Sequence, residues 1–296
     1  MTYDKFAEEV FDYLKARFED MEIKREEVLK NNGCMLTAYM VGGSKCIISI
    51  FPWYLFQTYK EQKCDFTELM ETLIKECSKD LQEVRYDVSG YYDYEKVKKM
   101  LRGKLINAEL NAEYLKDVPH REFLDLSLVY YLEVERKGYG GIALVVVREK
   151  MLSEWKVDEE TLYRQTMENM EERSAGRIRS ILSILIESKG IEWACRNLGT
   201  LPLYVLTNAD RVLGAVEVLD ERNLTLASTM LGGDYWLIPS SLHEFILLPV
   251  REDDHDEEFL SKVIREVNES EVADEEILSY HLYRYRTETG KVEIAA

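Results

Sequence analysis

Ser240, Ser241, His243 and Glu244 place two hydroxyls, an imidazole and a carboxylate within five residues of the chain. A hydrolase or peptidase could use either serine as the nucleophile, His243 as its base and Glu244 to orient the imidazole. Neighbouring side chains point in different directions, however, so such triads normally draw on separate parts of a chain. The spacing Ser241-x-x-Glu244 also has the form of a capping box, which predicts a tight turn between two strands. No G-x-S-x-G motif is present to raise a serine at a strand-to-helix turn.

His120, Glu122 and Asp125 form a second candidate cluster, which could combine with His243 into an acid–base or metal site. Neither H-E-x-x-H nor H-x-H spacing occurs, and two scattered histidines fall short of the three ligands of a catalytic zinc. The competing interpretation is a solvated loop before a strand, in which Arg121 pairs with Glu122 or Asp125. We predict no metal and no cofactor, because the glycine pairs also lack the spacing of nucleotide-binding loops.

The only dense run of basic residues predicts the solvated face of an amphipathic helix. Its members are Lys96, Lys98, Lys99, Arg102 and Lys104. Tyr94, Val97 and Leu101 supply the apolar stripe of this predicted helix, and Gly103 is expected to end it. A nucleic-acid contact is the alternative. The chain has 56 acidic and 38 basic residues and a net charge of −18, which argues against binding to phosphates.

Charge and cysteine usage predict a cytoplasmic protein without a membrane partner. Charged residues within Met1–Val10 argue against a signal peptide. The most apolar runs, Ile142–Val147 and Phe245–Val250, are far shorter than the roughly 18 residues of a membrane span. Five cysteines occur without a C-x-x-C pair, so we expect five reduced thiols.

The first third of the chain predicts a helix, an antiparallel meander and further helices. Apolar residues from Tyr3 to Phe18 recur at helical spacing. Turn residues at 31–33 and 41–43 separate three strand-like segments, and Pro52 ends the last of them. Asp65 is expected to cap a helix that runs to about Leu81. The pattern breaks over 86–93, which predicts two domains, 1–90 and 91–296.

The remainder predicts mixed strands and helices. Alternation from Leu124 to Glu135 indicates a strand with one face buried and the other largely exposed, while Ile142–Val147 indicates a central strand covered on both faces. Residues 149–197 are expected to be helical, as are the segment after Asp220 and residues near 259–267. Further strands are expected at 203–207, 212–218, 235–238, 245–248 and 280–285. This order has no regular β-α-β rhythm, so the predicted class is α+β, with mixed, largely antiparallel sheets and flanking amphipathic helices.

Several segments resemble an uncharacterised bacterial family of the domain-of-unknown-function group. They are Lys116–Asp125, Leu203–Asn208, Gly233–Glu244, and Glu266–Asn268 with Glu271 and Val272. The likeness lies in the whole arrangement and extends to the N-terminal part. It implies a bacterial, soluble protein with no established activity, so no site residue is carried over from it.

Our first functional interpretation is a non-enzymatic, acidic, cytoplasmic protein-interaction module. It rests on the absence of catalytic motifs, the net charge and the 19 tyrosines, a residue type suited to interfaces. The expected partner is another protein with a basic surface, and one variant is a nucleic-acid mimic. The alternative is a Ser/His-dependent hydrolase or peptidase assembled around His243 and His120. The sequence leaves the oligomeric state open.

Overall fold

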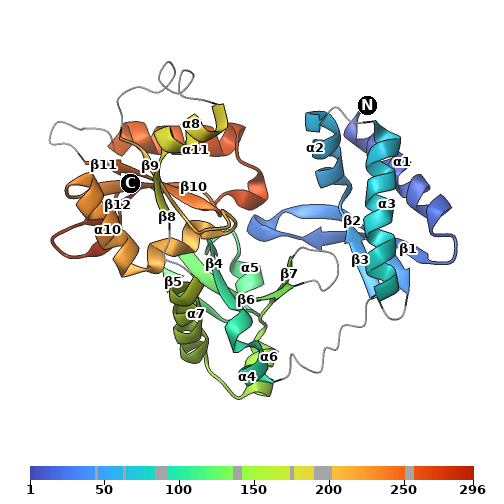
Figure 1. The fold of residues 1–296 in the computed structure, drawn as a ribbon, viewed down its shortest axis with the longest axis horizontal. Helices are drawn as coiled ribbons and strands as arrows, with labels where there is room; N and C mark the ends of the chain where they lie inside the picture. The colour runs from blue at the N-terminus through green and yellow to red at the C-terminus, as the bar shows by residue number, and fades with distance from the viewer. Residues whose placement is uncertain are drawn as a thin grey trace. The chain divides into compact units, whose positions relative to one another are not determined.

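The computed structural model describes residues 1–43, 46–62, 65–83, 93–135, 142–173, 177–189, 202–250 and 257–296. The chain divides into two compact units, Met1–Val88 and Ser89–Ala296 (Figure 1). Predicted features at 86–92 and 190–197 lie outside the described residues. The expectation of two separately folding domains stays a prediction.

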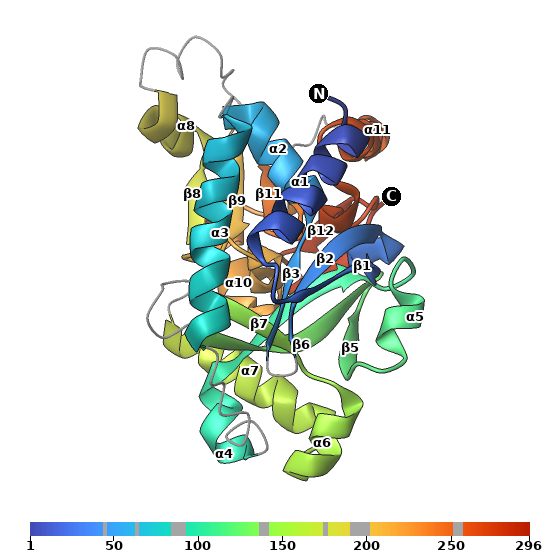
Figure 2. The ribbon, with the colours of Figure 1, turned by 90° about the vertical axis from the view of Figure 1, so that its right-hand side faces the viewer.

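In the described residues, the first unit is a three-stranded antiparallel sheet with helices packed on its second and third strands (Figure 2). Phe6, Val10 and Leu14 lie on one face of the first helix and are fully buried. Asp65 accepts a hydrogen bond from the backbone N–H of Thr67 at 2.8 Å, as expected of a helix cap. The predicted helix, the meander and the capped helix are therefore confirmed, but Val41, Gly42 and Gly43, expected to form a turn, belong to the second strand. In chain order the elements are α1 (Tyr3–Arg17), β1 (Glu22–Leu29), η1 (Asn31–Gly33), β2 (Met35–Gly43), β3 (Cys46–Ile50), α2 (Pro52–Gln62) and α3 (Phe66–Glu83).

The described residues of the second unit form two antiparallel sheets. The elements that build the first sheet and its helices are α4 (Tyr94–Val97), η3 (Lys98–Met100), β4 (Leu101–Asn107), α5 (Ala112–Leu115), β5 (His120–Phe123), β6 (Leu126–Glu135), β7 (Ile142–Val146), α6 (Glu149–Trp155) and α7 (Glu159–Arg173). The elements that follow are β8 (Arg177–Ser180), α8 (Ile181–Lys189), β9 (Tyr204–Thr207), η4 (Gly214–Leu219), α10 (Glu221–Leu231), β10 (Tyr235–Ser241), β11 (Glu244–Pro249), α11 (Glu257–Ser270), η5 (Asp274–Glu276), β12 (Tyr283–Arg286) and β13 (Lys291–Ile294).

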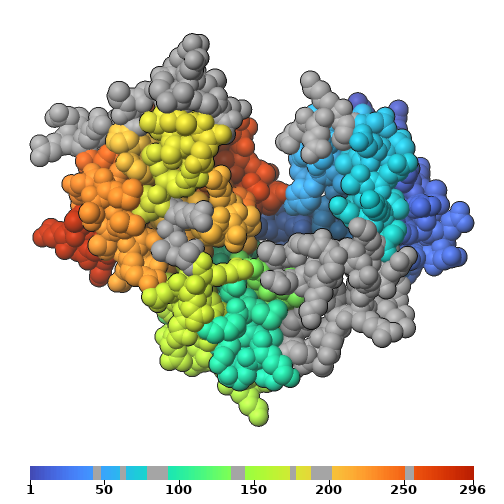
Figure 3. All heavy atoms as spheres, viewed as in Figure 1, coloured from blue at the N-terminus to red at the C-terminus, as the bar shows by residue number. Residues whose placement is uncertain are grey.

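The two sheets of the Ser89–Ala296 unit share one apolar core. In one sheet β6 pairs with β4 on one edge, and with β5 and β7 on the other. The other sheet has the order β13-β12-β10-β11-β9-β8. One large apolar core contains buried residues from both sheets and from η4 and α10, while parts of α7, α8 and α10 lie at the surface (Figure 3). The antiparallel sheets and flanking helices confirm the predicted α+β class.

The prediction for the basic stretch was wrong in its secondary structure. The helix ends within the short turns α4 and η3, and Leu101–Asn107 is a strand. Leu101, Gly103 and Leu105 are buried on one face of this strand, whereas Arg102 and Lys104 are partly exposed on the other. The alternation of basic and apolar residues therefore has the period of a strand.

Two strands differ from prediction in their burial. Ser127, Val129 and Tyr131 are buried, so β6 is covered on both faces rather than one. The pattern predicted β7 as a central strand, but within the described residues it pairs with β6 alone, and Leu144 is 49 % exposed.

Four further segments correct the expected elements. Ile178 lies in strand β8 rather than a helix, and most of 212–218 forms the 3₁₀ helix η4 rather than a strand. Pro239 lies within β10 and does not end it. The last predicted strand begins three residues later than expected, at Tyr283. The expected helices after Asp220 and near 259–267 are confirmed as α10 and α11.

Candidate functional site

The serine–histidine segment forms the hairpin between β10 and β11. Ser240 and Ser241 end β10, and Glu244 begins β11 opposite Ser241. The Ser241 hydroxyl accepts a hydrogen bond from the backbone N–H of His243 at 3.1 Å. This two-residue span is a serine turn, so the tight turn is confirmed and the predicted capping box is wrong.

The imidazole of His243 binds backbone rather than a serine. Its Nδ1 atom lies 3.0 Å from the backbone nitrogen of Leu213, which donates to it, and its Nε2 atom lies 3.4 Å from Glu276 Oε1. Because Nδ1 accepts, a neutral ring carries its proton on Nε2. Among the described residues, no hydrogen bond joins this imidazole to the hydroxyl of Ser240 or Ser241.

His120 and Asp125 have separate partners. The exposed His120 places its Nδ1 atom 2.8 Å from the backbone oxygen of Val118. Asp125 accepts hydrogen bonds from the hydroxyls of Ser279 at 2.7 Å and Tyr283 at 2.6 Å. No hydrogen bond or ion pair connects His120 with His243 in the described part of the chain.

Arg121 has different partners from those expected. It binds Glu159 at 2.7 Å and Glu160 at 2.5 Å, both on α7, rather than Glu122 or Asp125. Its guanidinium lies 3.8 Å from the ring centroid of Tyr163. These contacts fix α7 against β5.

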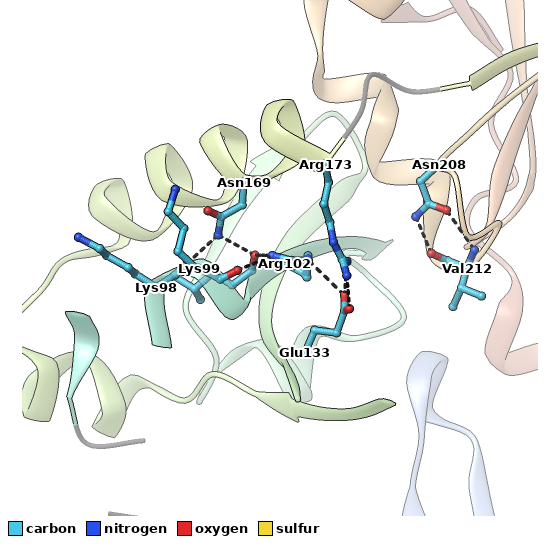
Figure 4. Close-up of polar contacts among 9 residues, drawn as sticks. Lys98, Lys99, Arg102, Glu133, Asn169, Arg173, Asn208 and Val212 are labelled. Atoms are coloured by element: carbon cyan, nitrogen blue, oxygen red, sulfur yellow. Dashed lines mark hydrogen bonds and ion pairs between the residues drawn. The ribbon is translucent and has the colours of Figure 1, made fainter. Parts of the chain in front are cut away.

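The lysines of the basic stretch form ion pairs near the surface. Lys98 binds Glu95 at 2.5 Å, and Lys99 binds Glu172 at 2.6 Å. Arg102 differs from them because its side chain is only 14 % exposed and points toward Glu133 (Figure 4). Arg102 lines a cavity that the sequence patterns do not predict.

A cavity of about 420 Å³ lies among β4, β6, β7, α7 and the segment from residue 208 to η4. Its volume falls within the range of about 300–1,000 Å³ typical of ligand sites. Apolar walls come from Leu144, Met170, Val212, Leu213 and Val216. Its charged groups are Arg102, Glu133, Arg173, Asp210 and Glu217. None of the predicted candidates Ser240, Ser241, His243, Glu244, His120 and Asp125 is among the described residues that line it.

Two guanidiniums meet one carboxylate in this cavity. Arg173 reaches from α7 and donates to both oxygens of Glu133 at 2.6 Å, while Arg102 Nε donates to Oε2 at 3.1 Å (Figure 4). Burial of Glu133 opposes its ionisation, but Arg173 and Arg102 outweigh this and hold its pKa below the usual value. Burial and the charge of Glu133 raise the pKa of Tyr131, on the same wall, to about 12. The cluster is thus ionised at neutral pH except for the tyrosine.

Glu217 is the most perturbed acid of the cavity. It belongs to η4 and is only 5 % exposed. Its Oε2 atom accepts a hydrogen bond from the Asn223 side chain at 3.0 Å. Burial, assisted by the charge of Asp220 and opposed by the Asn223 hydrogen bond, raises its pKa to about 7. Glu217 therefore exchanges a proton near neutral pH, as functional acids often do.

Local sequence shapes the wall from Asn208 to Gly214. The Asn208 amide donates to the backbone oxygen of Val212 at 2.7 Å and accepts from its N–H at 3.2 Å (Figure 4). Arg211 and Leu213 have φ angles of 57° and 55°, a region that costs energy for these residue types. The bond from the Leu213 N–H to His243 helps to hold this conformation. His243 is thus not part of the described lining of the cavity, but it holds the lining residue Leu213 in place.

Gly103 and Gly214 permit close packing around the cavity. A Cβ atom on Gly103 would lie 2.6 Å from Leu128 Cδ1, and one on Gly214 would lie 2.6 Å from the backbone nitrogen of Asn208. Both distances are too short for real contacts, so larger residues would displace the wall.

The described residues contain no group of three or more His, Cys, Asp and Glu side chains arranged to hold a metal ion. No helix in the described ranges is both long and apolar enough to cross a bilayer.

Comparison with known proteins identifies the family but no activity. Searches of curated proteins and of solved structures gave no match. One family model matches residues 3–287, nearly the whole chain, and its description is a family of unknown function, DUF5688. The resemblance inferred from the sequence segments is thereby confirmed, and the chain belongs to the DUF5688 family.

Proposed function

We propose that this chain is a non-enzymatic protein-interaction module whose partner inserts a side chain into the cavity of the Ser89–Ala296 unit. The observation that carries the proposal is the cavity itself, with apolar walls and a small set of charged groups. A mostly apolar concave pocket with a few placed polar groups suits a small molecule or a single side chain. Protein partners commonly bind by placing one anchor side chain in such a pocket.

The contacts of the serine–histidine segment favour this proposal over a hydrolase. Ser241 accepts from the backbone of the hairpin, and His243 accepts from the backbone of Leu213. A nucleophile and its base need a mutual hydrogen bond and access to substrate. These residues instead support a turn and a cavity wall.

The net charge of −18 supports a partner with a basic surface, because opposite charges speed encounter and exclude wrong partners. Mimicry of a nucleic acid is one form that such charge complementarity could take. We place the protein in the cytoplasm, on the expectation that all five cysteines are reduced.

Selection from a random-peptide display library tests the proposal. The full chain serves as bait, with two variants that introduce the same side chain, tryptophan, at half-exposed apolar sites. Val212→Trp narrows the cavity, and Leu226→Trp on α10 is the matched control, since Val212 is 52 % and Leu226 49 % exposed.

We expect enriched peptides with a net positive charge that bind the unmodified chain and Leu226→Trp but lose at least tenfold affinity for Val212→Trp. Absence of enrichment, or equal binding to both variants, would contradict the proposal. Labelling of Ser240 or Ser241 by a serine-reactive phosphonate would favour the hydrolase instead.

A further inference from the structure

The cavity lining holds more acidic than basic side chains. Its described lining holds three carboxylates, Glu133, Asp210 and Glu217, against two guanidiniums, Arg102 and Arg173. Both guanidiniums donate to Glu133. Asp210 acts on Arg173 through its charge. One acid is therefore in excess.

In the described structure neither Asp210 nor Glu217 has a cation bonded to it, but Asp210 is exposed whereas Glu217 is only 5 % exposed. Its side-chain partner is the neutral amide of Asn223. The nearby Arg222 donates to both oxygens of Asp220, at 2.7 and 3.0 Å, and also binds Glu171. An ionised carboxylate buried without a cation is unfavourable, so a cation that enters the cavity would be stabilised there.

The other charged residues around η4 do not supply a cation that binds the Glu217 carboxylate in the described structure. The elements packed against η4 include β4, β11 and α10. Their charged residues are Arg102 and Lys104 on β4, Glu244 on β11, and Glu221 and Arg222 on α10, which is capped by Asp220. Among these groups, Asp220 and Arg222 influence the ionisation of Glu217, and they oppose one another.

We propose that the partner's anchor in this cavity is a basic side chain, arginine or lysine, whose cationic nitrogen binds the Glu217 carboxylate. Val216, Leu213 and Met170 supply apolar surface for the methylene stem of such a side chain. An anionic anchor would have to compete with Glu133 for the guanidiniums and would meet the excess carboxylate. The inference rests on the proposed function and names the chemistry of the group that enters.

Blocked amino acids test this inference by ligand-observed NMR on the full chain. N-acetyl-arginine amide is compared with N-acetyl-citrulline amide, which keeps the shape of arginine and removes its charge. N-acetyl-lysine amide and N-acetyl-glutamate amide complete the set, and butylguanidine separates a free small cation from an amino-acid side chain. Glu217→Gln is the test variant, and Glu221→Gln, which changes an exposed acid at the start of α10, is its control.

We expect the unmodified chain and Glu221→Gln to bind the arginine or lysine derivative at least tenfold more tightly than the citrulline derivative at pH 8. Glu217→Gln should lose this preference, and Val212→Trp should weaken both compounds. Because the pKa of Glu217 is about 7, affinity for the cation should fall about tenfold from pH 8 to pH 6.

Four results would overturn the inference, and the first three concern the amino-acid derivatives. These three are equal binding of arginine and citrulline derivatives, an unchanged preference in Glu217→Gln, and no binding of either basic derivative. If butylguanidine binds but the arginine and lysine derivatives do not, the cavity takes a free small cation and not a side chain of a protein. That result would also overturn the inference. If display-selected peptides need the open cavity yet tolerate replacement of every basic residue, the proposed function stands and only this inference fails.

Discussion

The Nδ1 atom of His243 accepts a hydrogen bond from the backbone N–H of Leu213 at 3.0 Å, joining the β10–β11 hairpin to the wall of the cavity. Leu213 has a positive φ angle and lines the cavity, so the histidine stabilises a conformation that the chain adopts at a cost. The spacing of Ser241 and His243 suggests a nucleophile and its base, but in the structure the His243 imidazole accepts a hydrogen bond from the main chain.

His243→Ala is expected to destabilise the protein by about 1–3 kcal/mol, because a partly buried N–H loses its acceptor. Denaturant unfolding of His243→Ala and of the control His120→Ala gives the comparison. The exposed His120 should change the free energy of unfolding by less than about 0.5 kcal/mol. Equal effects of the two changes would refute this role for His243.

Ser241→Ala is expected to cost roughly 0.5–1.5 kcal/mol, since the hydroxyl accepts from the His243 N–H in the hairpin. Ser240→Ala, one residue earlier, should cost much less. Chemical denaturation measures both variants. A neutral or stabilising Ser241→Ala would contradict the serine turn and would revive the nucleophile, because active sites often store strain.

Glu217 should make the protein less stable as pH rises. Its pKa is about 7 when folded, against an ordinary value of 4.5, so the folded state holds the proton more tightly than the unfolded state. Protonation of Glu217 therefore stabilises the folded state fully below pH 4.5, and this stabilisation is lost as pH rises through 7. Glu217→Gln should therefore be more stable than the unmodified chain by about 3 kcal/mol at pH 8 and nearly equal to it at pH 4.5. Urea unfolding at several pH values measures the difference, and a gap that does not change with pH would refute it.

Arg102 and Lys99 should behave differently although both belong to the basic stretch. Arg102→Gln removes one of the two guanidiniums on a carboxylate that is only 9 % exposed, and it should cost about 1.5–3 kcal/mol. Lys99→Gln removes an exposed ion pair and should change stability by less than about 0.5 kcal/mol. Thermal or denaturant unfolding of the two variants separates them. A loss no larger for Arg102 than for Lys99 would show that the cluster at Glu133 contributes nothing.

Local patterns predicted much of the fold because the responsible forces are local. The stripe Phe6, Val10 and Leu14 identifies α1, and Asp220 with Gly232 marks both ends of α10. Predictions failed where tertiary packing overrides the pattern. The segment around Val216 has the composition of a strand, yet it forms a 3₁₀ helix packed against β4 and β9.

The cavity could not be predicted from spacing. Arg102, Glu133, Arg173 and Glu217 come from β4, β6, α7 and η4, and no local motif links them. The fold alone brings them together. The sequence contains one usable signal, the alternation of basic and apolar residues around Arg102, which has the period of a strand although its apolar spacing also fits a helix.

The ionisation of Glu217 tests the account most directly. The carboxyl carbon of Glu217 can be followed by NMR during a pH titration of the full chain, with and without saturating N-acetyl-arginine amide. We expect a midpoint near pH 7 in the free protein, and a midpoint at least one pH unit lower when the arginine derivative is bound, because a cation stabilises the carboxylate. A midpoint near 4.5 in the free protein, or one that the arginine derivative leaves unchanged, would contradict the account.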